Sequence, residues 1–274
     1  MVRRAEVSRR AAEKGLPERS IEHDYCLSWV LIALGSREFL YDLLAFKGGT
    51  CLRKVYFPEW RYSEDLDFTA ARRVDPARVI EQIEDACAEL RERVGLVASV
   101  DLSSVASDDA TLSLNISYVG PLSRTSQLGR IKVDISMDEV VLTPPQRRAV
   151  FAEYSDQMEC SAAIRAYTLE EICAEKIRSM LQRTEPRDLY DVWRILQEPP
   201  EDFADVDLQE MVVQKCIKKR VRFEGFDALL SDERLSRFRR SWGERLHHQI
   251  VGLPDFGRVA RELSRDLRRL ADLR

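Results

Sequence analysis

A double glycine followed by a strand with two carboxylates is the feature that most constrains this chain. Gly48-Gly49 interrupts an apolar segment, and Asp65 lies sixteen residues after the second glycine, enough for a short helix and a returning loop. Asp65 and Asp67 are two positions apart, so a strand through them carries both side chains on one face. Leu66 and Phe68 then point to the opposite face, toward a core.

This combination favours a divalent cation that holds a nucleoside triphosphate, because Mg²⁺ prefers one or two carboxylates together with phosphate and water oxygens. Gly48-Gly49 lets the backbone approach a ligand closely, and the N–H groups of the following helix can receive phosphate oxygens. Lys54, four residues after Thr50 on that helix, is placed to reach the same phosphates. The alternative is an ordinary turn and a polar strand edge paired with Arg61.

The composition indicates a soluble globular protein, with 45% hydrophobic and 33% charged residues among 274. No run of about 18 apolar residues is present, so we expect no membrane association, and no apolar core follows the N-terminal arginines as in a signal peptide. Six scattered cysteines without paired metal spacing favour reduced thiols of a cytoplasmic protein. The chain has no G-x-S-x-G, Walker or H-E-x-x-H motif, which disfavours hydrolases, P-loop enzymes and zinc proteases.

Hydrophobic periodicity predicts an α+β protein, a mixed-sheet core followed by a helical C-terminal domain. Pro144-Pro145 marks the boundary, so the expected domains are residues 1–145 and 146–274. In the first domain we expect helices over 17–34, 50–56 and 75–94, and strands over 43–46, 66–69, 96–102, 111–119 and 130–137. In the second we expect helices over 168–183, 187–197, 205–219, 231–249 and 255–272.

Asp134 is a candidate third carboxylate. Ile131, Val133 and Ile135 line one face of its strand, so Asp134 lies on the other. If that strand lies beside the one that carries Asp65, Asp134 joins the same site, where a third acid can deprotonate an attacking hydroxyl. A solvent-facing position is the equally weighted alternative.

Two polar residues of the expected helical domain, Lys176 and Asp188, are further residues to consider for the site. Lys176 interrupts the apolar stripe of helix 168–183, which favours contact with a phosphate over snorkelling to the helix edge. Asp188 opens the next helix, where an N-cap or dipole partner is the ordinary role, so it does not indicate a site by itself.

Charge is unevenly distributed along the chain. Residues 211–274 contain 16 Lys or Arg against 9 Asp or Glu, although the whole chain has a net charge of −4. This basic tail is a candidate surface for a polyanion, with a solvated helical face as the alternative.

Taken together, the motifs resemble the AbiEii/AbiGii nucleotidyltransferase-like toxins, which have a polymerase-beta-type nucleotidyltransferase fold. The similarity extends over about residues 17–195, with the motifs in the same order. They are Ile21-Glu-His-Asp-Tyr25, Phe46-Lys-Gly-Gly-Thr-Cys-Leu-Arg-Lys54, Arg61-Tyr-Ser-Glu-Asp-Leu-Asp-Phe68, Glu171 through Lys176, and Arg187-Asp-Leu-Tyr-Asp191.

The resemblance implies a toxin of a toxin–antitoxin pair, encoded beside a DNA-binding antitoxin. Members bind nucleoside triphosphate, and several transfer nucleotides onto the 3′ end of tRNA. Residue by residue, it implies a phosphate-binding motif of Gly48, Gly49 and Lys54, a metal pair of Asp65 and Asp67 with Ser63 just upstream, a helix lysine, Lys176, and an essential acid, Asp188.

We therefore interpret the chain as a Mg²⁺-dependent nucleotidyltransferase toxin acting on RNA, with the tRNA 3′ end as the expected acceptor. Alternatives are transfer to a small molecule or protein, and a nucleotide-binding pseudoenzyme that docks a partner. The expected catalytic residues are Asp65, Asp67, Lys176 and Asp188. The expected nucleotide-binding residues are Gly48, Gly49, Thr50, Lys54, Ser63 and Lys176, and the expected metal ligands are Asp65, Asp67 and Asp134.

Overall fold

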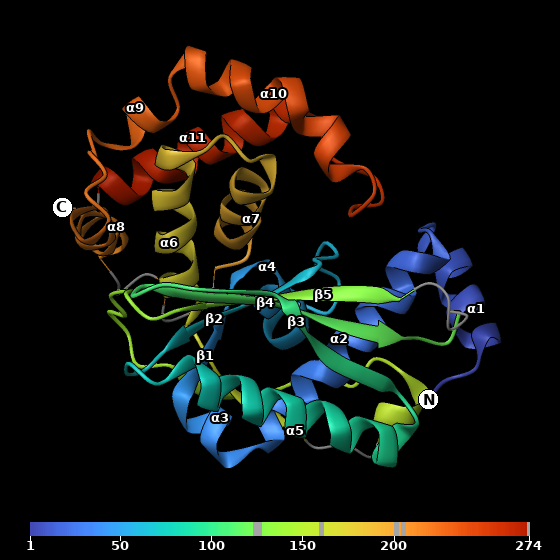
Figure 1. The fold of residues 1–274 in the computed structure, drawn as a ribbon. Coiled ribbons are helices and arrows are strands. Elements are labelled where there is room, and N and C mark those ends of the chain that lie inside the picture. Colours follow the sequence, from blue (N-terminus) through green and yellow to red (C-terminus); the bar gives the residue numbers. More distant parts are fainter. Residues whose placement is uncertain (123–127, 159–161, 200–202, 204–206, 273–274) are drawn as a thin grey trace. The chain divides into compact units, whose positions relative to one another are not determined.

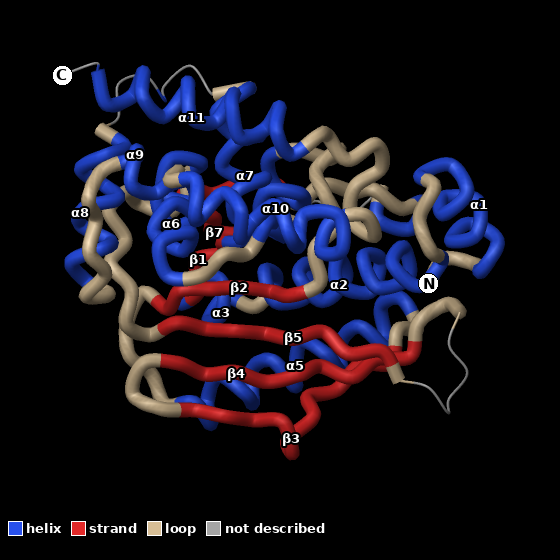
Figure 2. Tube along the Cα trace, turned by 90° about the horizontal axis from the view of Figure 1, so that it is seen from above, coloured by secondary structure: helices blue, strands red, loops and turns tan. Residues whose placement is uncertain are grey.

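A mixed sheet of seven strands organises the N-terminal part of the chain, in the order β3-β4-β5-β2-β1-β7-β6. The pairs β2–β5 and β1–β7 are parallel and the others are antiparallel. Figure 2 shows β3, β4, β5 and β2 side by side. The strands are β1 (Leu44–Lys47), β2 (Asp65–Ala70), β3 (Val97–Ser107), β4 (Thr111–Val119), β5 (Gly129–Ser136), β6 (Gln146–Ala149) and β7 (Ala163–Ala166). The expected α+β fold is confirmed.

The computed structural model describes residues 1–122, 128–158, 162–199, 203 and 207–272. It divides into a sheet unit, Met1–Glu139 with Pro145–Tyr167, and a helical unit, Val140–Pro144 with Thr168–Arg274. The boundary expected at 145/146 is therefore displaced, because β6 and β7 add residues 146–166 to the sheet. Both are four-residue strands, too short for an alternating pattern to reveal.

Helices α2, α3 and α5 lie along one face of the sheet (Figure 1). The sheet supplies that core with buried apolar side chains, which include Phe68, Leu114 and Val133. Local signals fix the ends of α5: Asp75 caps its first turn, and Gly95 ends it in the left-handed conformation. The helices of this unit are α1 (Arg4–Lys14), α2 (Glu18–Ser36), α3 (Glu38–Leu43), α4 (Gly48–Cys51) and α5 (Pro76–Val94), with a π-helical turn η1 (Leu52–Tyr56) after α4.

The helical unit is held at its beginning by a buried carboxylate. Glu171 accepts the backbone N–H groups of Leu142 and Thr143 and pairs with the Lys215 ammonium at 2.6 Å. Thr168 caps the first helix, because its hydroxyl oxygen accepts the backbone N–H of Glu171. The helices are α6 (Leu169–Gln182), α7 (Pro186–Gln197), α8 (Leu208–Lys218), α9 (Phe226–Leu229), α10 (Asp232–Leu246) and α11 (Phe256–Asp272). Of the helix expected over 205–219, residues 205 and 206 lie outside the described residues. No helix in the described ranges is long and apolar enough to cross a membrane.

Buried ion pairs join α2 to η1 in the sheet unit. Asp24 accepts hydrogen bonds from Arg53 Nε at 2.9 Å and Lys54 Nζ at 2.7 Å, and Tyr154 donates a third. Glu153 is the second carboxylate for both cations. Burial alone would raise the pKa of Asp24, but the charges of Arg53 and Lys54 hold that pKa well below its ordinary value. The segment after the glycine turn is thereby fixed to α2.

Asp24→Asn should lower the free energy of unfolding by about 3–5 kcal/mol, because Arg53 and Lys54 would share one carboxylate inside the protein. Since the folded pKa of Asp24 is depressed, its stabilisation is complete above the ordinary carboxyl pKa of about 3.9 and is lost as pH falls below it. The difference in the free energy of unfolding between Asp24→Asn and wild type should therefore become smaller at acid pH.

Urea unfolding at neutral and acid pH measures this difference. Glu59→Gln is the control, because Glu59 forms an exposed pair with Lys14 whose removal should cost less than about 1 kcal/mol. Equal stability of Asp24→Asn and Glu59→Gln would contradict the assigned role of the buried network.

Candidate active site

Strand register lines up charged and polar residues across four strands of the sheet unit. Lys47 of β1 is the partner of Asp67 of β2, Asp67 is the partner of Asp134 of β5, and Asp134 is the partner of Ser113 of β4. The neighbouring residues Phe46 and Phe68 pack ring to ring in the core. Because side chains alternate along a strand, this polar row lies on the opposite face of the sheet.

A second row lies beside the first. Asp65 is in register with Lys132, two residues before the pair of Asp67 and Asp134 on the same strands. The Lys132 ammonium lies 2.6 Å from the Asp134 carboxylate. That hydrogen bond raises the pKa of Lys132, and the negative charges of Asp134, Asp65 and Asp67 raise it further. The carboxylates therefore create a negative potential that attracts cations to this face.

Asp134 lies where the sequence argument requires it, on the strand beside β2. Its carboxylate accepts a hydrogen bond from the Ser113 hydroxyl at 2.6 Å and pairs with Lys132. Among the residues that the structure describes, no three His, Cys, Asp or Glu side chains form a metal-binding group. A cation here would rest on Asp65, Asp67 and ligand oxygens, and ligation by Asp134 stays a prediction.

The glycine turn lies directly against the carboxylate strand. Gly48 has φ +81°, and a Cβ atom built on it would overlap the Asp67 carboxylate. A Cβ on Gly49 would overlap the guanidinium of Arg61 and lie 3.2 Å from the Ser63 hydroxyl oxygen. The absence of side chains on both glycines therefore allows Asp67, Arg61 and Ser63 to approach one backbone turn.

Two predicted nucleotide-binding residues, Thr50 and Lys54, make polar contacts within the protein. The Thr50 hydroxyl donates a 2.6 Å hydrogen bond to the carbonyl oxygen of Asp65, which ties the glycine turn to β2. Lys54 is 0% exposed, and its ammonium pairs with Asp24 and Glu153. The structure does not bring Lys54 into the group around Gly48-Gly49, because its charge is compensated in the interior. The sequence spacing gave no indication of these two partners.

Sequence reasoning missed Lys47 and Tyr167 as residues of the polar face. Lys47 is 8% exposed, and its ammonium lies 5.8 Å from the centre of the Tyr167 ring. The Tyr167 hydroxyl donates to the Thr69 hydroxyl oxygen at 2.7 Å. Lys47 immediately precedes the glycines, but only the pairing of β1 with β2 places it opposite Asp67. Tyr167 carries no sequence signal of this kind.

In the helical unit, the two predicted site residues form one buried ion cluster. Lys176 Nζ lies 2.9 Å from an oxygen of Asp188 and 2.9 Å from an oxygen of Asp191. Arg183 Nε contacts the other Asp188 oxygen at 2.9 Å. Burial would raise the pKa of Asp188, but Lys176 and Arg183 bring it below its ordinary value. These ion pairs explain why a lysine can lie within the apolar stripe of α6. A contact between Lys176 and a phosphate stays a prediction.

Comparison with known proteins identifies the class as nucleotidyltransferases of toxin–antitoxin systems. The family model described as nucleotidyl transferase AbiEii toxin, Type IV TA system, matches residues 29–270. The chain therefore belongs to the AbiEii nucleotidyltransferase toxin family, as its motifs led us to expect.

Two solved structures show the same fold. The nucleotidyltransferase toxin MenT4 from Mycobacterium tuberculosis superposes with a TM-score of 0.70 at 20% identity, covering 100% of this chain and 91% of its own. JHP933 from Helicobacter pylori has a TM-score of 0.53 at 17% identity, covering 93% of each chain. A search of the curated proteins found no match.

Gly48→Ala should reduce nucleotide transfer by about 100-fold, because the added methyl group displaces the Asp67 carboxylate and small displacements of a reacting geometry have effects of this size. Gly95→Ala is the matched control. Gly95 has a similar φ of +72°, but nothing lies within 4 Å of its added Cβ.

Both variants carry the left-handed backbone penalty of about 1–2 kcal/mol, so Gly95→Ala accounts for the effect of that penalty. Initial rates with labelled nucleoside triphosphates, at matched folded fractions, make the comparison. Equal rates for the two variants would show that the close approach at Gly48 does not matter.

Proposed function

We propose that the chain transfers nucleotides from a nucleoside triphosphate to an RNA acceptor, the 3′ end of tRNA, in a Mg²⁺-dependent reaction that blocks growth. Membership of the AbiEii toxin family supports nucleotidyl transfer and a cognate antitoxin; that the antitoxin binds DNA is part of the proposal. The observation that carries the site assignment is the register that places Asp67 between Lys47 and Asp134, with Gly48 against its carboxylate.

The polar face suits a divalent cation by the chemistry of its donors. Asp65 and Asp67 present hard oxygen ligands on one strand face, and Lys132 at present balances their charge. Mg²⁺ accepts two carboxylates when phosphates and water complete its coordination. When bound, the cation would neutralise charge on the triphosphate and help to orient it.

Residues near the cation would bind the phosphates and accept the proton of the attacking hydroxyl. Gly48-Gly49 would allow the phosphates to approach the backbone, with Arg61 and Ser63 as the charged and hydroxyl groups nearest to that turn. Nucleotidyl transfer joins an acceptor hydroxyl oxygen to the α-phosphorus and releases pyrophosphate. Asp134, adjacent to Asp67 in register, is our proposed acceptor for the hydroxyl proton.

The helical unit carries a charged group of its own, in which Lys176 pairs with Asp188. We keep Lys176 as a proposed phosphate ligand, since its side chain retains 11% of its accessible surface. Asp188 is fully buried between Lys176 and Arg183, and its depressed pKa makes it a poor proton acceptor. We therefore assign Asp188 the role of orienting Lys176.

Asp67→Asn should reduce transfer at least about 100-fold while the protein stays folded, because it removes a charge that holds the cation. Asp101→Asn is the control, since Asp101 lies on β3 and its carboxylate accepts hydrogen bonds from the backbone N–H and the hydroxyl of Ser103. The assay incubates each variant with total RNA and each labelled triphosphate in turn.

Label in a tRNA-sized product, lost in Asp67→Asn and retained in Asp101→Asn, is the expected result. Label in a small molecule or in protein would replace the RNA acceptor by the alternative acceptor class. Undiminished transfer by Asp67→Asn would overturn the site assignment.

A further inference from the structure

A groove rich in arginine lies between α10 and α11 of the helical unit. Its cavity has a volume of about 780 Å³. Asp232 is the one carboxylate among the described lining residues, and the guanidinium groups that line the groove belong to Arg239, Arg261, Arg265, Arg268 and Arg269. Low-dielectric walls around charges of one sign strengthen the local potential, so this concave surface should concentrate anions.

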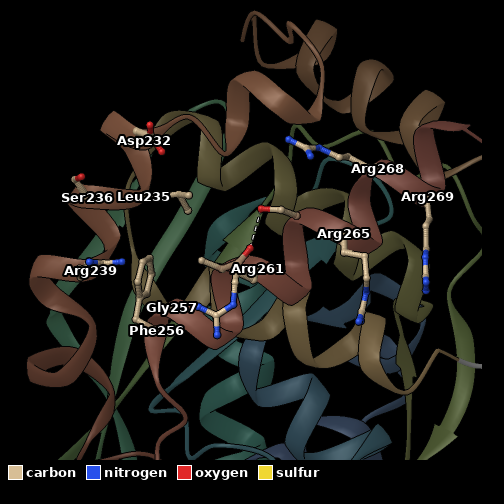
Figure 3. Close-up of a pocket in the computed structure, with 12 residues that line it drawn as sticks. Asp232, Leu235, Ser236, Arg239, Phe256, Gly257, Arg261, Arg265, Arg268 and Arg269 are labelled. Atoms are coloured by element: carbon tan, nitrogen blue, oxygen red, sulfur yellow. Dashed lines mark hydrogen bonds between the residues drawn. The ribbon is translucent and has the colours of Figure 1, made fainter.

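Four of the arginines form a stripe along one helix. Arg261, Arg265, Arg268 and Arg269 follow each other at intervals of four, three and one residues on α11. At 1.5 Å per residue the stripe is about 12 Å long. Figure 3 shows Arg265 and Arg269 extending in the same direction from α11. Apolar Val259, Leu263 and Leu267 are buried on the other side, so packing fixes which side of α11 carries the charge.

Some of the groove arginines have a carboxylate partner within the protein and others do not. Arg265 pairs with Asp266 and Arg268 pairs with Asp227. Arg239 lies over the Phe256 ring, 5.3 Å from its centre, as Figure 3 also shows. Among the side chains that the structure describes in residues 207–270, Arg239 and Arg261 form no ion pair.

Two arginines of the same helices that lie outside the groove pair with nearby carboxylates. Arg237 on α10 pairs with Glu233 at 2.5 Å, and Arg258 on α11 pairs with Glu262 at 2.9 Å, both one turn away. Neither arginine lines the groove. Arg265 and Arg268 of the groove are paired in the same way, so the charges that distinguish the groove from the surrounding surface are those of Arg239 and Arg261.

The presence of arginine as the groove's cation favours a ligand that contains phosphate groups. Every cation in the groove is arginine, whose planar guanidinium can bind a phosphate group through two parallel hydrogen bonds. For scale, successive phosphates of one strand of double-stranded DNA rise about 3.4 Å along the helix axis. A stripe of about 12 Å thus spans about three of them, more than a single phosphate ion needs.

We propose that the α10–α11 groove binds the phosphodiester backbone of RNA, with Arg239 and Arg261 as contacts from its two sides. The identification of that RNA as the acceptor strand rests on the proposed function. The groove contacts are to phosphates, so they hold the RNA without reading its sequence.

The test compares two double variants of the full-length chain by filter binding of total tRNA across a salt series, without triphosphate. Arg239→Gln with Arg261→Gln removes one groove arginine from each helix. Arg237→Gln with Arg258→Gln removes the same charge from the same two helices outside the groove. Thermal unfolding checks that all proteins are folded.

The groove variant should bind tRNA roughly tenfold more weakly at low salt, since charge-assisted hydrogen bonds are lost. Its dependence of log affinity on log salt concentration should flatten by about one unit per arginine removed. The control variant should keep both values. Equal weakening of the two variants, or no tRNA binding by the wild type, would overturn the proposal.

A small polyanion is the competing occupant, and calorimetry with inorganic tripolyphosphate tests it. Tripolyphosphate binding that the groove variant loses, with unchanged tRNA binding, would also overturn the proposal. Binding is measured without turnover, so the result does not depend on catalysis. If tRNA binds through the groove but accepts no nucleotide, the proposed acceptor fails while the binding surface stands.

Discussion

The register between β1, β2 and β5 is the constraint on which the candidate active site depends. It brings Lys47, Asp67 and Asp134 into one row on the polar face, and a slip of one residue would turn Asp67 into the core and Phe68 out of it. The buried contact of Phe46 with Phe68 opposes such a slip. Apolar packing on one face of the sheet thus positions the charged groups on the other.

The motifs that resemble the family contain residues of the candidate site and residues that only hold the fold together. Asp24 and Lys54 belong to two of the motifs that resemble the family, yet they meet in the interior and fix η1 to α2. Glu171, from a third motif, anchors residues 142 and 143. Burying such charges is costly unless they are paired, and loss of one partner is more damaging than loss of a surface pair. These residues would therefore affect activity through the fold.

Much of the fold was predictable from the sequence because long amphipathic elements carry strong periodic signals. The helix over 75–94 and the strand over 111–119 were expected and lie within a residue of their observed bounds. Asp65 and Asp67 also share the predicted strand face. Contacts between residues far apart in the sequence could not be predicted. Lys54 contacts Glu153, 99 positions away, and Tyr167 contacts Thr69, 98 positions away. No local pattern records such pairings, and four-residue strands such as β7 give too few residues for a period.

The metal site of Asp65 and Asp67 is the central claim, and direct measurement of cation binding tests it most sharply. Mn²⁺ can replace Mg²⁺ as a paramagnetic probe, titrated into the protein in the presence of a non-hydrolysable triphosphate analogue. Wild type should show one tightly bound Mn²⁺ per chain that depends on the analogue, because phosphate oxygens complete the coordination. The folded double variant Asp65→Asn with Asp67→Asn should lose it. Retention of that tight site in the variant would contradict the account.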